Sequence, residues 1–324
     1  MKGCLPLLTD TKILSPAQIT VWRKSIVPTD NRLAVITGSF NILQPGNLLA
    51  IQQAKQCANH VCVVLEPDKA HSTNRNFWNT ANIRAEMASC LQDVSAVFIV
   101  RAVKEDIQQL RPYILIDCLA QSGSSQLRLT AREEAETVID IPAVTGCFTR
   151  DIAEAFRISQ TPVQVPIDLC EPIPTSDDID RVTRSCRNGG YPLVTVNGCF
   201  DLLHIGHVRM LSHARSFGHE LIVLVNDDAS VRAYKGPTRP LFPIHFRLHA
   251  LNTLAPVSFA YPFPGDNPID MLSDIKPDIH VKGGTFEKDR VCQEQKLVES
   301  WGGHIEFCPM VKGYSTSRIL NVSH

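Results

Sequence analysis

Two histidines separated by two residues stand where a helix is expected to begin, after an apolar run at 193–196. His204 and His207 close the string Gly198-Cys199-Phe200-Asp201-Leu202-Leu203-His204-Ile205-Gly206-His207. This spacing puts both imidazoles on one helix face, one turn apart. A helix N-terminus offers unpaired backbone N–H groups and a partial positive charge, and Gly206 lets a phosphate approach the backbone. Either histidine alone is more often structural, but the whole string predicts a phosphate-binding turn.

A second candidate segment lies near the C-terminus. Ser315, Thr316 and Ser317 follow Gly313-Tyr314 and precede an apolar stretch that is expected to be helical. Hydroxyl and N–H groups at a helix start suit phosphate oxygens. The same residues are also ordinary N-cap residues, so the segment gains functional meaning only together with the histidine string.

Polar and basic residues follow the later apolar runs, at positions where open α/β sheets bind ligands. Lysine and arginine donate to phosphate oxygens, although a flexible surface lysine is the common alternative for Lys235. Cys199 is interpreted as a packing residue, and Asp201 either braces the turn or helps to position a metal ion. The other candidates are Asn226, Asp228, Lys235, Arg239, Arg247, Lys282, Gly283 and Gly284.

The two halves of the chain are copies of each other. Residues 37–47 align without gaps with 197–207, and the same register continues from 62–68 to 222–228. Helix starts at 15–19 and 175–179 also correspond. The match resumes, in the same order, at Arg84 with Arg247, at 110–114 with 275–279 and at 146–149 with 313–316.

Each copy is read as helix, apolar strand, Gly-containing turn, amphipathic helix and second apolar strand, with strands at 33–36, 61–65, 193–196 and 221–225. Short apolar runs that alternate with helical stretches predict a parallel sheet covered on both faces. The expected fold class is therefore α/β, with two tandem doubly wound domains at residues 11–160 and 175–324. Four prolines predict a linker over residues 161–174.

The bulk composition excludes several classes of protein. With 32 basic and 33 acidic residues in 324, the formal net charge is −1, so no global field attracts a nucleic acid. No apolar stretch is long enough to cross a bilayer and residues 1–10 do not resemble a secretory signal, so a cytoplasmic protein without membrane contact is expected. The 11 cysteines form no C-x-x-C pair. Those in apolar runs, such as Cys62 and Cys308, are expected to be reduced and buried.

The first copy lacks the residues that could do chemistry. Gln44 and Asn47 replace the histidines, Phe148-Thr149-Arg150 replaces the hydroxyl run, and Asp117-Cys118-Leu119 replaces Lys-Gly-Gly. Glutamine and asparagine carry no positive charge, and Asp117 adds an acidic group where a phosphate chain would lie. We expect this copy to be inactive and to serve as a structural partner of the second; residual ligand binding is the alternative.

The two motifs resemble the signatures of the cytidylyltransferase-like nucleotidyltransferases, which transfer AMP or CMP to phosphorylated small molecules and release pyrophosphate. His204, Gly206 and His207 match the H-x-G-H signature without departure, and 313–317 resembles the family's Gly-x-Ser-Thr-Ser/Thr run. The resemblance implies two Rossmann-like domains, the first degenerate. It also implies that the histidines contact the triphosphate and stabilise charge as the bond between the α and β phosphates breaks.

Further matches, over 177–320, resemble the adenylyltransferases that make ADP-heptose from heptose 1-phosphate. They are Asp228-Ala229-Ser230, the Lys-Gly-x-x-Arg-Pro run at 235–240, Arg247 and Val281-Lys282-Gly283-Gly284. The resemblance implies a catalytic set of His204, His207 and Lys235, and Mg²⁺ bound to ATP. The implied nucleotide-binding set is Gly198, Cys199, Phe200, Asp201, Gly206, Asn226, Asp228, Arg239, Arg247, Lys282, Gly283, Gly284, Ser315, Thr316 and Ser317.

Three functions stay open at this point. The favoured one is attack by the phosphate oxygen of a sugar 1-phosphate on the α-phosphorus of ATP, with ATP and a sugar phosphate as partners. The second keeps the mechanism with CTP and a polyol or amino-alcohol phosphate. The third is a non-catalytic nucleotide-binding or scaffold protein. Packing of the two copies against each other is expected, and a homo-oligomer is left open.

Overall fold

The computed structural model of the 324-residue chain describes residues 12–26, 32–38, 40–68, 79–118, 126–141, 165, 170, 172–283 and 288–308. The chain divides into two compact units. The first contains the described elements from β1 to β6 and the second those from α7 to β11. The boundaries of the predicted domains and linker fall mostly outside the described residues and stay a prediction.

The described strands of the first unit form a six-stranded sheet in which every pair is parallel, in the order β1-β4-β3-β2-β5-β6. Its strands are β1 (Ile13–Leu14), β2 (Leu33–Gly38), β3 (His60–Leu65), β4 (Ala96–Ile99), β5 (Ile114–Cys118) and β6 (Thr137–Ile141). Its helices are α1 (Pro16–Ile26), α2 (Pro45–Cys57), α3 (Ala81–Ser89), α4 (Val103–Leu110) and α5 (Gln126–Glu134).

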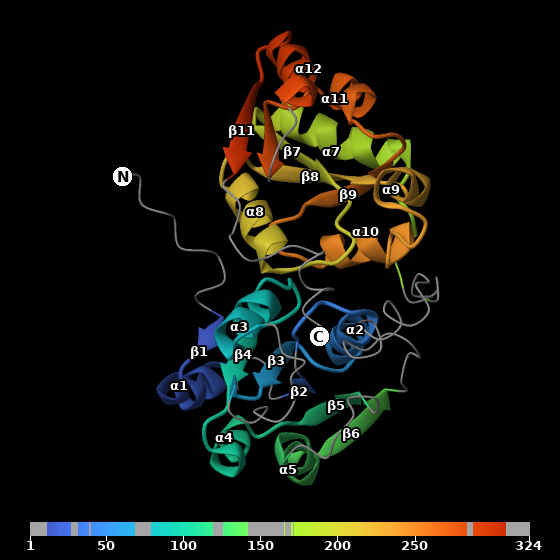
Figure 1. Ribbon diagram of the computed structural model, residues 1–324. Coiled ribbons are helices and arrows are strands. Elements are labelled where there is room, and N and C mark those ends of the chain that lie inside the picture. Colours follow the sequence, from blue (N-terminus) through green and yellow to red (C-terminus); the bar gives the residue numbers. More distant parts are fainter. Residues whose placement is uncertain are drawn as a thin grey trace. The chain divides into compact units, whose positions relative to one another are not determined.

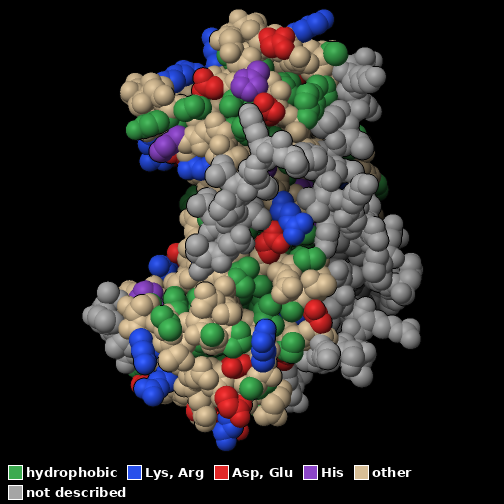
Figure 2. Space-filling model, turned by 90° about the vertical axis from the view of Figure 1, so that its left-hand side faces the viewer, with side chains coloured by type: hydrophobic (Ala, Val, Ile, Leu, Met, Phe, Trp, Pro, Cys, Tyr) green, Lys and Arg blue, Asp and Glu red, His purple; other side chains and the backbone are tan. Residues whose placement is uncertain are grey.

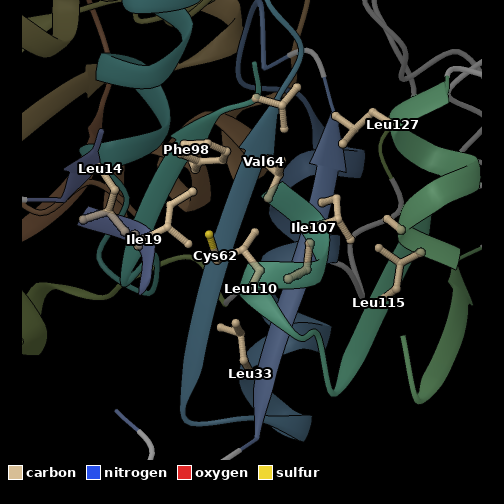
Figure 3. Close-up of a cluster of buried hydrophobic side chains, with 14 of the residues drawn as sticks. Leu14, Ile19, Leu33, Cys62, Val64, Phe98, Ile107, Leu110, Leu115 and Leu127 are labelled. Carbon is tan, nitrogen blue, oxygen red and sulfur yellow. The ribbon is translucent and has the colours of Figure 1, made fainter. Parts of the chain in front are cut away.

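The core of this unit lies between the sheet and the helices α1, α4 and α5. Figure 3 shows Ile19, Ile107, Leu110 and Leu127 from these helices meeting Leu33, Cys62, Val64, Phe98 and Leu115 from the strands. Helices α2 and α3 lie on the opposite face of the sheet (Figure 1). Burial raises the pKa of Cys62 to about 12, so this thiol is a packing group, as predicted.

The second unit has a five-stranded parallel sheet in the order β11-β10-β7-β8-β9. Its strands are β7 (Leu193–Gly198), β8 (Glu220–Asn226), β9 (Phe259–Phe263), β10 (Ile279–Gly283) and β11 (His304–Cys308). Its helices are α7 (Ser176–Gly189), α8 (Ile205–Arg215), α9 (Asp228–Lys235), α10 (Ile244–Asn252), α11 (Ile269–Ile275) and α12 (Lys288–Glu299). Figure 1 shows α7, α11 and α12 on one face of this sheet and α8 and α10 on the other.

Corresponding backbone details confirm that the two units are copies. Both sheets share one strand order, apart from the additional β1 at the edge of the first. Phe40 and Phe200, in the turns after β2 and β7, have positive φ angles of 47° and 46°. Arg111 and Lys276 end α4 and α11 in the left-handed conformation, and each precedes a proline. Two α/β units with parallel sheets and helices on both faces confirm the predicted tandem Rossmann-like fold.

The order of the strands locates the place where a ligand fits. In the second unit β7 is the first strand in sequence and lies in the middle, with β8 and β9 on one side and β10 and β11 on the other. The direction of strand addition therefore reverses between β7 and β10. Open α/β sheets bind ligands beyond the carboxyl ends of the strands at such a switch point.

The described surface has no dominant charge on the face shown in Figure 2, where lysine and arginine side chains are interspersed with aspartate and glutamate side chains. Such a mixture provides no single-sign field over that face. Among the described residues, no helix combines the length and the apolar character that crossing a membrane requires.

Candidate active site

The turn after β7 gives the histidine string its shape. Gly198 ends the strand, and a Cβ atom there would come within 3.1 Å of the Phe200 ring. Phe200 adopts a positive φ angle, which is uncommon for a bulky residue and redirects the chain towards α8. His204 is the N-cap residue of α8, and Gly206 is the second residue of the helix. The apolar positions Val208, Leu211 and Ala214 are buried as predicted, so they fix α8 against the sheet.

The two histidines stack on each other at the start of α8. Their ring centroids are 3.8 Å apart and their planes are inclined by 18°. The His207 ring also lies beside Phe200, with centroids 5.3 Å apart. His204 is only 6% exposed, and within the described part of the chain the buried Nδ1 atoms of both histidines have no hydrogen-bond partner. This arrangement confirms the predicted common face.

The surroundings keep both imidazoles uncharged. Burial, assisted by the Lys235 ammonium, lowers the pKa of His204 from 6.5 to about 4. Burial and the neighbouring His204 lower the pKa of His207 well below its ordinary value. Lys235 is the exposed last residue of α9, and it lies close enough for its charge to act on both rings. At neutral pH each imidazole therefore keeps one N–H donor and one acceptor nitrogen.

Asp201 braces the turn. Its buried Oδ1 accepts hydrogen bonds from the backbone N–H groups of Leu241 (2.6 Å) and Phe242 (3.1 Å). Its Oδ2 lies 2.7 Å from the guanidinium of the buried Arg239. The sequence left two roles open for Asp201, bracing the turn or helping to position a metal ion. The structure displays the first of these, and Arg239 lies in the segment that is braced.

Arg247, on α10, ties three segments together. Its side chain is 1% exposed and donates to the carbonyl of Phe242 (3.1 Å), to the carbonyl of Cys199 (2.5 Å) and to Asp228 Oδ1 (2.7 Å). The Cys199 thiol lies 3.8 Å from Asn226 Oδ1, and the Asn226 amide donates to the carbonyl of Gly265. These contacts connect Cys199, which follows β7, with Asn226 at the end of β8. The Arg247 guanidinium donates to groups of the protein itself.

Lys282 reaches across the switch point. Its Nζ donates to Asn197 Oδ1 (2.9 Å) and lies 2.5 Å from Glu294 Oε2 of α12. The exposed fractions of the Lys282 and Glu294 side chains are 14% and 3%. Because Asn197 is on β7 and Lys282 on β10, the ammonium group connects the two strands between which the sheet reverses.

Gly283 has a packing role at the end of β10. A Cβ atom there would meet the Met210 sulfur of α8 at 2.0 Å, so the side chain of Met210 lies against the bare backbone. The expected role of Gly283 in lining a nucleotide pocket stays a prediction. Gly284, Ser315, Thr316 and Ser317 lie outside the described residues.

The first unit presents different side chains at the corresponding positions. Gln44 is the N-cap residue of α2, and both Gln44 and Asn47 are buried. Asp117, at the position of Lys282, is 2% exposed and pairs with Arg128 (2.7 Å) and with Arg132. The acidic group at Asp117 is thus paired with two guanidinium groups, which the sequence did not predict. Phe148 lies outside the described residues.

Sequence reasoning missed Asn197 and Glu294. A signal for Glu294 exists: Val291, Glu294 and Val298 follow helical spacing, and all three are buried. A carboxylate within an apolar helical stripe needs a cationic partner, since an unpaired buried charge is strongly unfavourable. The partner itself could not be identified from spacing.

In the described ranges of the chain, no group of three or more histidine, cysteine, aspartate or glutamate side chains could hold a metal ion. The Asp201 carboxylate is engaged by Arg239 and two backbone N–H groups. The residues that the structure describes therefore do not form a resident metal centre.

Comparisons with known proteins agree with this geometry. The cytidylyltransferase-like family matches residues 195–322. The Bifunctional protein HldE of Koribacter versatilis (strain Ellin345) is 37% identical over 164 residues, which cover 51% of this chain and 33% of that protein. The Bifunctional protein HldE of Pectobacterium carotovorum subsp. carotovorum (strain PC1) is 34% identical over 232 residues, which cover 63% of this chain and 48% of that protein. The chain thus spans less than half the length of these relatives.

A solved structure is also similar. The lipopolysaccharide core biosynthesis protein from Thermoplasma volcanium GSS1 aligns with 39% of this chain and 100% of its own, at 26% sequence identity and a TM-score of 0.33.

The stacked histidines at the N-terminus of α8, the switch point between β7 and β10, and the family match all fall within one unit. Residues 195–322 of this chain match the cytidylyltransferase-like family, and these comparisons indicate a nucleotidyltransferase domain in the C-terminal region.

Proposed function

We propose that the second unit transfers AMP from ATP to heptose 1-phosphate, giving ADP-heptose and pyrophosphate. The observation that carries this proposal is the stacked pair of neutral imidazoles, His204 and His207, at the N-terminus of a helix beside the switch point. Several matches support the choice of substrates, namely Asp228-Ala229-Ser230, the run at 235–240, Arg247 and Val281-Lys282-Gly283-Gly284. The similarity to the HldE proteins agrees with it.

The arrangement suits phosphoryl chemistry, in which positioning and electrostatics supply most of the catalysis. The sugar phosphate oxygen attacks the α-phosphorus in line while the bond to the β-phosphate breaks. His204 and His207 offer N–H donors to the oxygens on which negative charge grows. Lys235 adds a cation that is already close to both rings, and the start of α8 adds backbone N–H groups.

Mg²⁺ is proposed to arrive as part of the MgATP substrate. Its charge is balanced mainly by the triphosphate oxygens, so it needs few protein ligands. We place the reaction in the cytoplasm, where ATP is available.

A cytidylyltransferase reaction is the second candidate, and the match of residues 195–322 to the cytidylyltransferase-like family supports it. It would use CTP with a polyol or amino-alcohol phosphate at the same histidines. A non-catalytic role is less well supported, because a scaffold has no need of two stacked buried imidazoles beside a lysine.

A pyrophosphate-release panel tests the proposal. The full chain is incubated with MgATP or MgCTP and with heptose 1-phosphate, glucose 1-phosphate or glycerol 3-phosphate. We expect release above background only with ATP and heptose 1-phosphate. Equal or faster release with CTP and glycerol 3-phosphate would establish the second candidate, and no release with any pair would support the non-catalytic reading.

A further inference from the structure

A column of polar side chains runs through the apolar layer of the second unit, on the face that α7, α11 and α12 cover. Thr195 Oγ1 lies 2.8 Å from His280 Nδ1. His280 Nε2 lies 3.7 Å from Glu294 Oε2, which also pairs with Lys282. His280 is fully buried, and Glu294 nearly so. The column ends at the Lys282 ammonium, at the carboxyl edge of the sheet.

The first unit shows that the fold does not require this column. Strand register pairs Thr195 with His280 in the second unit, and the corresponding register pairs Val35 with Leu115 in the first. Val35 and Leu115 belong to the hydrophobic core of their unit. A buried polar network is seldom more stabilising than apolar packing of the same volume. The polar column is present in the second unit, whereas apolar residues occupy the corresponding strand positions of the first. We therefore attribute the column to function and not to the fold.

In both units the strand at this point carries a charged residue that pairs with opposite charge on the next helix, and the signs are exchanged. The second unit has Lys282 on β10 with Glu294 on α12, and the first has Asp117 on β5 with Arg128 and Arg132 on α5. The strand residue thus brings a cation to the switch point in one unit and an anion in the other. An ammonium group at the end of the strand can donate to a phosphate oxygen, whereas a carboxylate at that position has no donor to offer.

Glu294 does more than neutralise Lys282. A lysine has four rotatable side-chain bonds and loses rotamer entropy when it is fixed. Glu294 Oε2 and Asn197 Oδ1 hold Nζ from two sides, so the ammonium is already placed when a nucleotide arrives. Preorganisation of this kind raises affinity by reducing the ordering cost of binding.

We propose that Glu294 is a positioning residue, which holds the Lys282 ammonium at the β7/β10 switch point to bind the polyphosphate of the nucleotide. The inference rests on the proposed function and deepens it, since it assigns the contact with the polyphosphate to the cationic donor that the strand of the second unit carries at this point.

The first test exchanges the two charges. Lys282→Asp combined with Glu294→Arg gives the strand and the helix of the second unit the signs of charge that β5 and α5 carry in the first unit. We expect a thermal unfolding transition close to that of the unaltered chain and at least a tenfold loss of affinity for MgATP, measured by calorimetric titration without sugar phosphate. Unchanged MgATP affinity in a folded double variant would overturn the inference.

The second test keeps Lys282 and removes only the carboxylate charge. We expect Glu294→Gln to raise the KM for MgATP about tenfold and to leave kcat within about twofold, because the Lys282 ammonium is no longer held in place before the nucleotide binds. The matched control is Glu299→Gln, which removes an exposed carboxylate from the same helix and should change neither parameter. A loss of thermal stability in Glu294→Gln without any change in KM would reduce the pair to a structural role.

These two measurements separate the inference from the proposed function. If the unaltered chain binds neither MgATP nor MgCTP, the polyphosphate role of Lys282 is wrong. If it binds MgATP and loses that binding on charge exchange, yet releases no pyrophosphate with any acceptor, the inference holds and the transfer reaction fails. If the double variant does not fold, the KM of Glu294→Gln decides.

Discussion

At the scale of single residues, the decisive feature is that His204 and His207 are held uncharged. Each ring is desolvated, each faces the other, and Lys235 adds a positive potential. A triphosphate brings several negative charges to the same place, and an opposite charge nearby favours the protonated imidazole. Binding of the nucleotide is therefore expected to raise both pKa values.

Removing either imidazole tests its part in the reaction. We expect His204→Ala and His207→Ala each to lower the rate of pyrophosphate release by a factor on the order of 10² to 10³, the usual loss when one preorganised donor is removed. Turnover is measured with saturating MgATP, and thermal unfolding serves as the control for folding. A variant that unfolds like the unaltered chain and keeps full turnover would exclude the histidine from the chemistry.

The low pKa of the histidines also makes stability depend on pH. The folded-state pKa of His204 is about 4, whereas the unfolded value is 6.5. Between these two values the unfolded chain binds more protons, so the free energy of unfolding falls as the pH is lowered from 6.5 to 4. The contribution of His204 is about 3 kcal/mol at most. Above pH 6.5 it does not change.

The variant His204→Gln/His207→Gln should lack that part of the slope. Urea unfolding at pH 7, 6, 5 and 4 measures it, and the unaltered chain is the reference. The buried His280 titrates in the same direction and is present in both proteins, so the difference between the two curves reports the pair. Parallel curves would contradict the low pKa of the histidines.

At the scale of elements, the buried arginines act as braces. Arg247 joins α10 to the turn after β7 and to the start of α9. The first unit keeps part of this arrangement, because Arg84 pairs with Asp68, which corresponds to Asp228, and also donates to the carbonyl of Glu66 (2.7 Å). The buried arginine and its aspartate partner are thus retained in a unit that lacks the histidines. We therefore attribute this pair to the stability of the fold.

We therefore expect Arg247→Met and Arg84→Met to lower the free energy of unfolding of their own units by about 3 kcal/mol or more, because buried carbonyl oxygens lose their donors. Scanning calorimetry measures both, with the exposed Arg232→Met on α9 as the matched control. A change of KM for MgATP in Arg247→Met without any loss of stability would instead indicate a ligand contact.

At the scale of the whole molecule, one fold occurs twice with different contents. The strand order, the positive φ angles of Phe40 and Phe200 and the arginine braces are retained. Among the described residues, the stacked histidines, Lys282 and the polar column occur in the second unit and not at the corresponding positions of the first. Fold and site have thus diverged independently, because the apolar faces that specify the sheet are separate from the strand ends that form the site.

Restoring histidines in the first unit should not create a second site. The variant Gln44→His/Asn47→His, made together with His204→Ala/His207→Ala, is expected to release no more pyrophosphate than the latter pair alone. Asp117 with its two arginines still takes the place of Lys282 and Glu294. Pyrophosphate release measured with MgATP checks this, and any gain over the parent variant would mean that the histidines alone suffice.

The sequence by itself determined the fold and the local motifs. Apolar runs at 33–36, 61–65, 193–196 and 221–225 became strands within one or two residues of their expected bounds. The histidine spacing fixed a stacked pair, because residues three apart on a helix share a face whatever surrounds them. The internal repeat predicted two units of one topology. All of these depend on short-range spacing or on patterns repeated along the chain.

Tertiary structure alone decided which distant groups meet. The chain separates Lys282 from Asn197 by 85 residues, and only the parallel pairing of β7 with β10 brings them together. Asp201 allowed two interpretations in sequence, and its neighbours in space, two backbone N–H groups and Arg239, favour bracing. The two arginines that pair with Asp117 could not be identified from the sequence either. The charge and hydrogen bonding of a buried group depend on its partners in three dimensions, and spacing along the chain does not encode them.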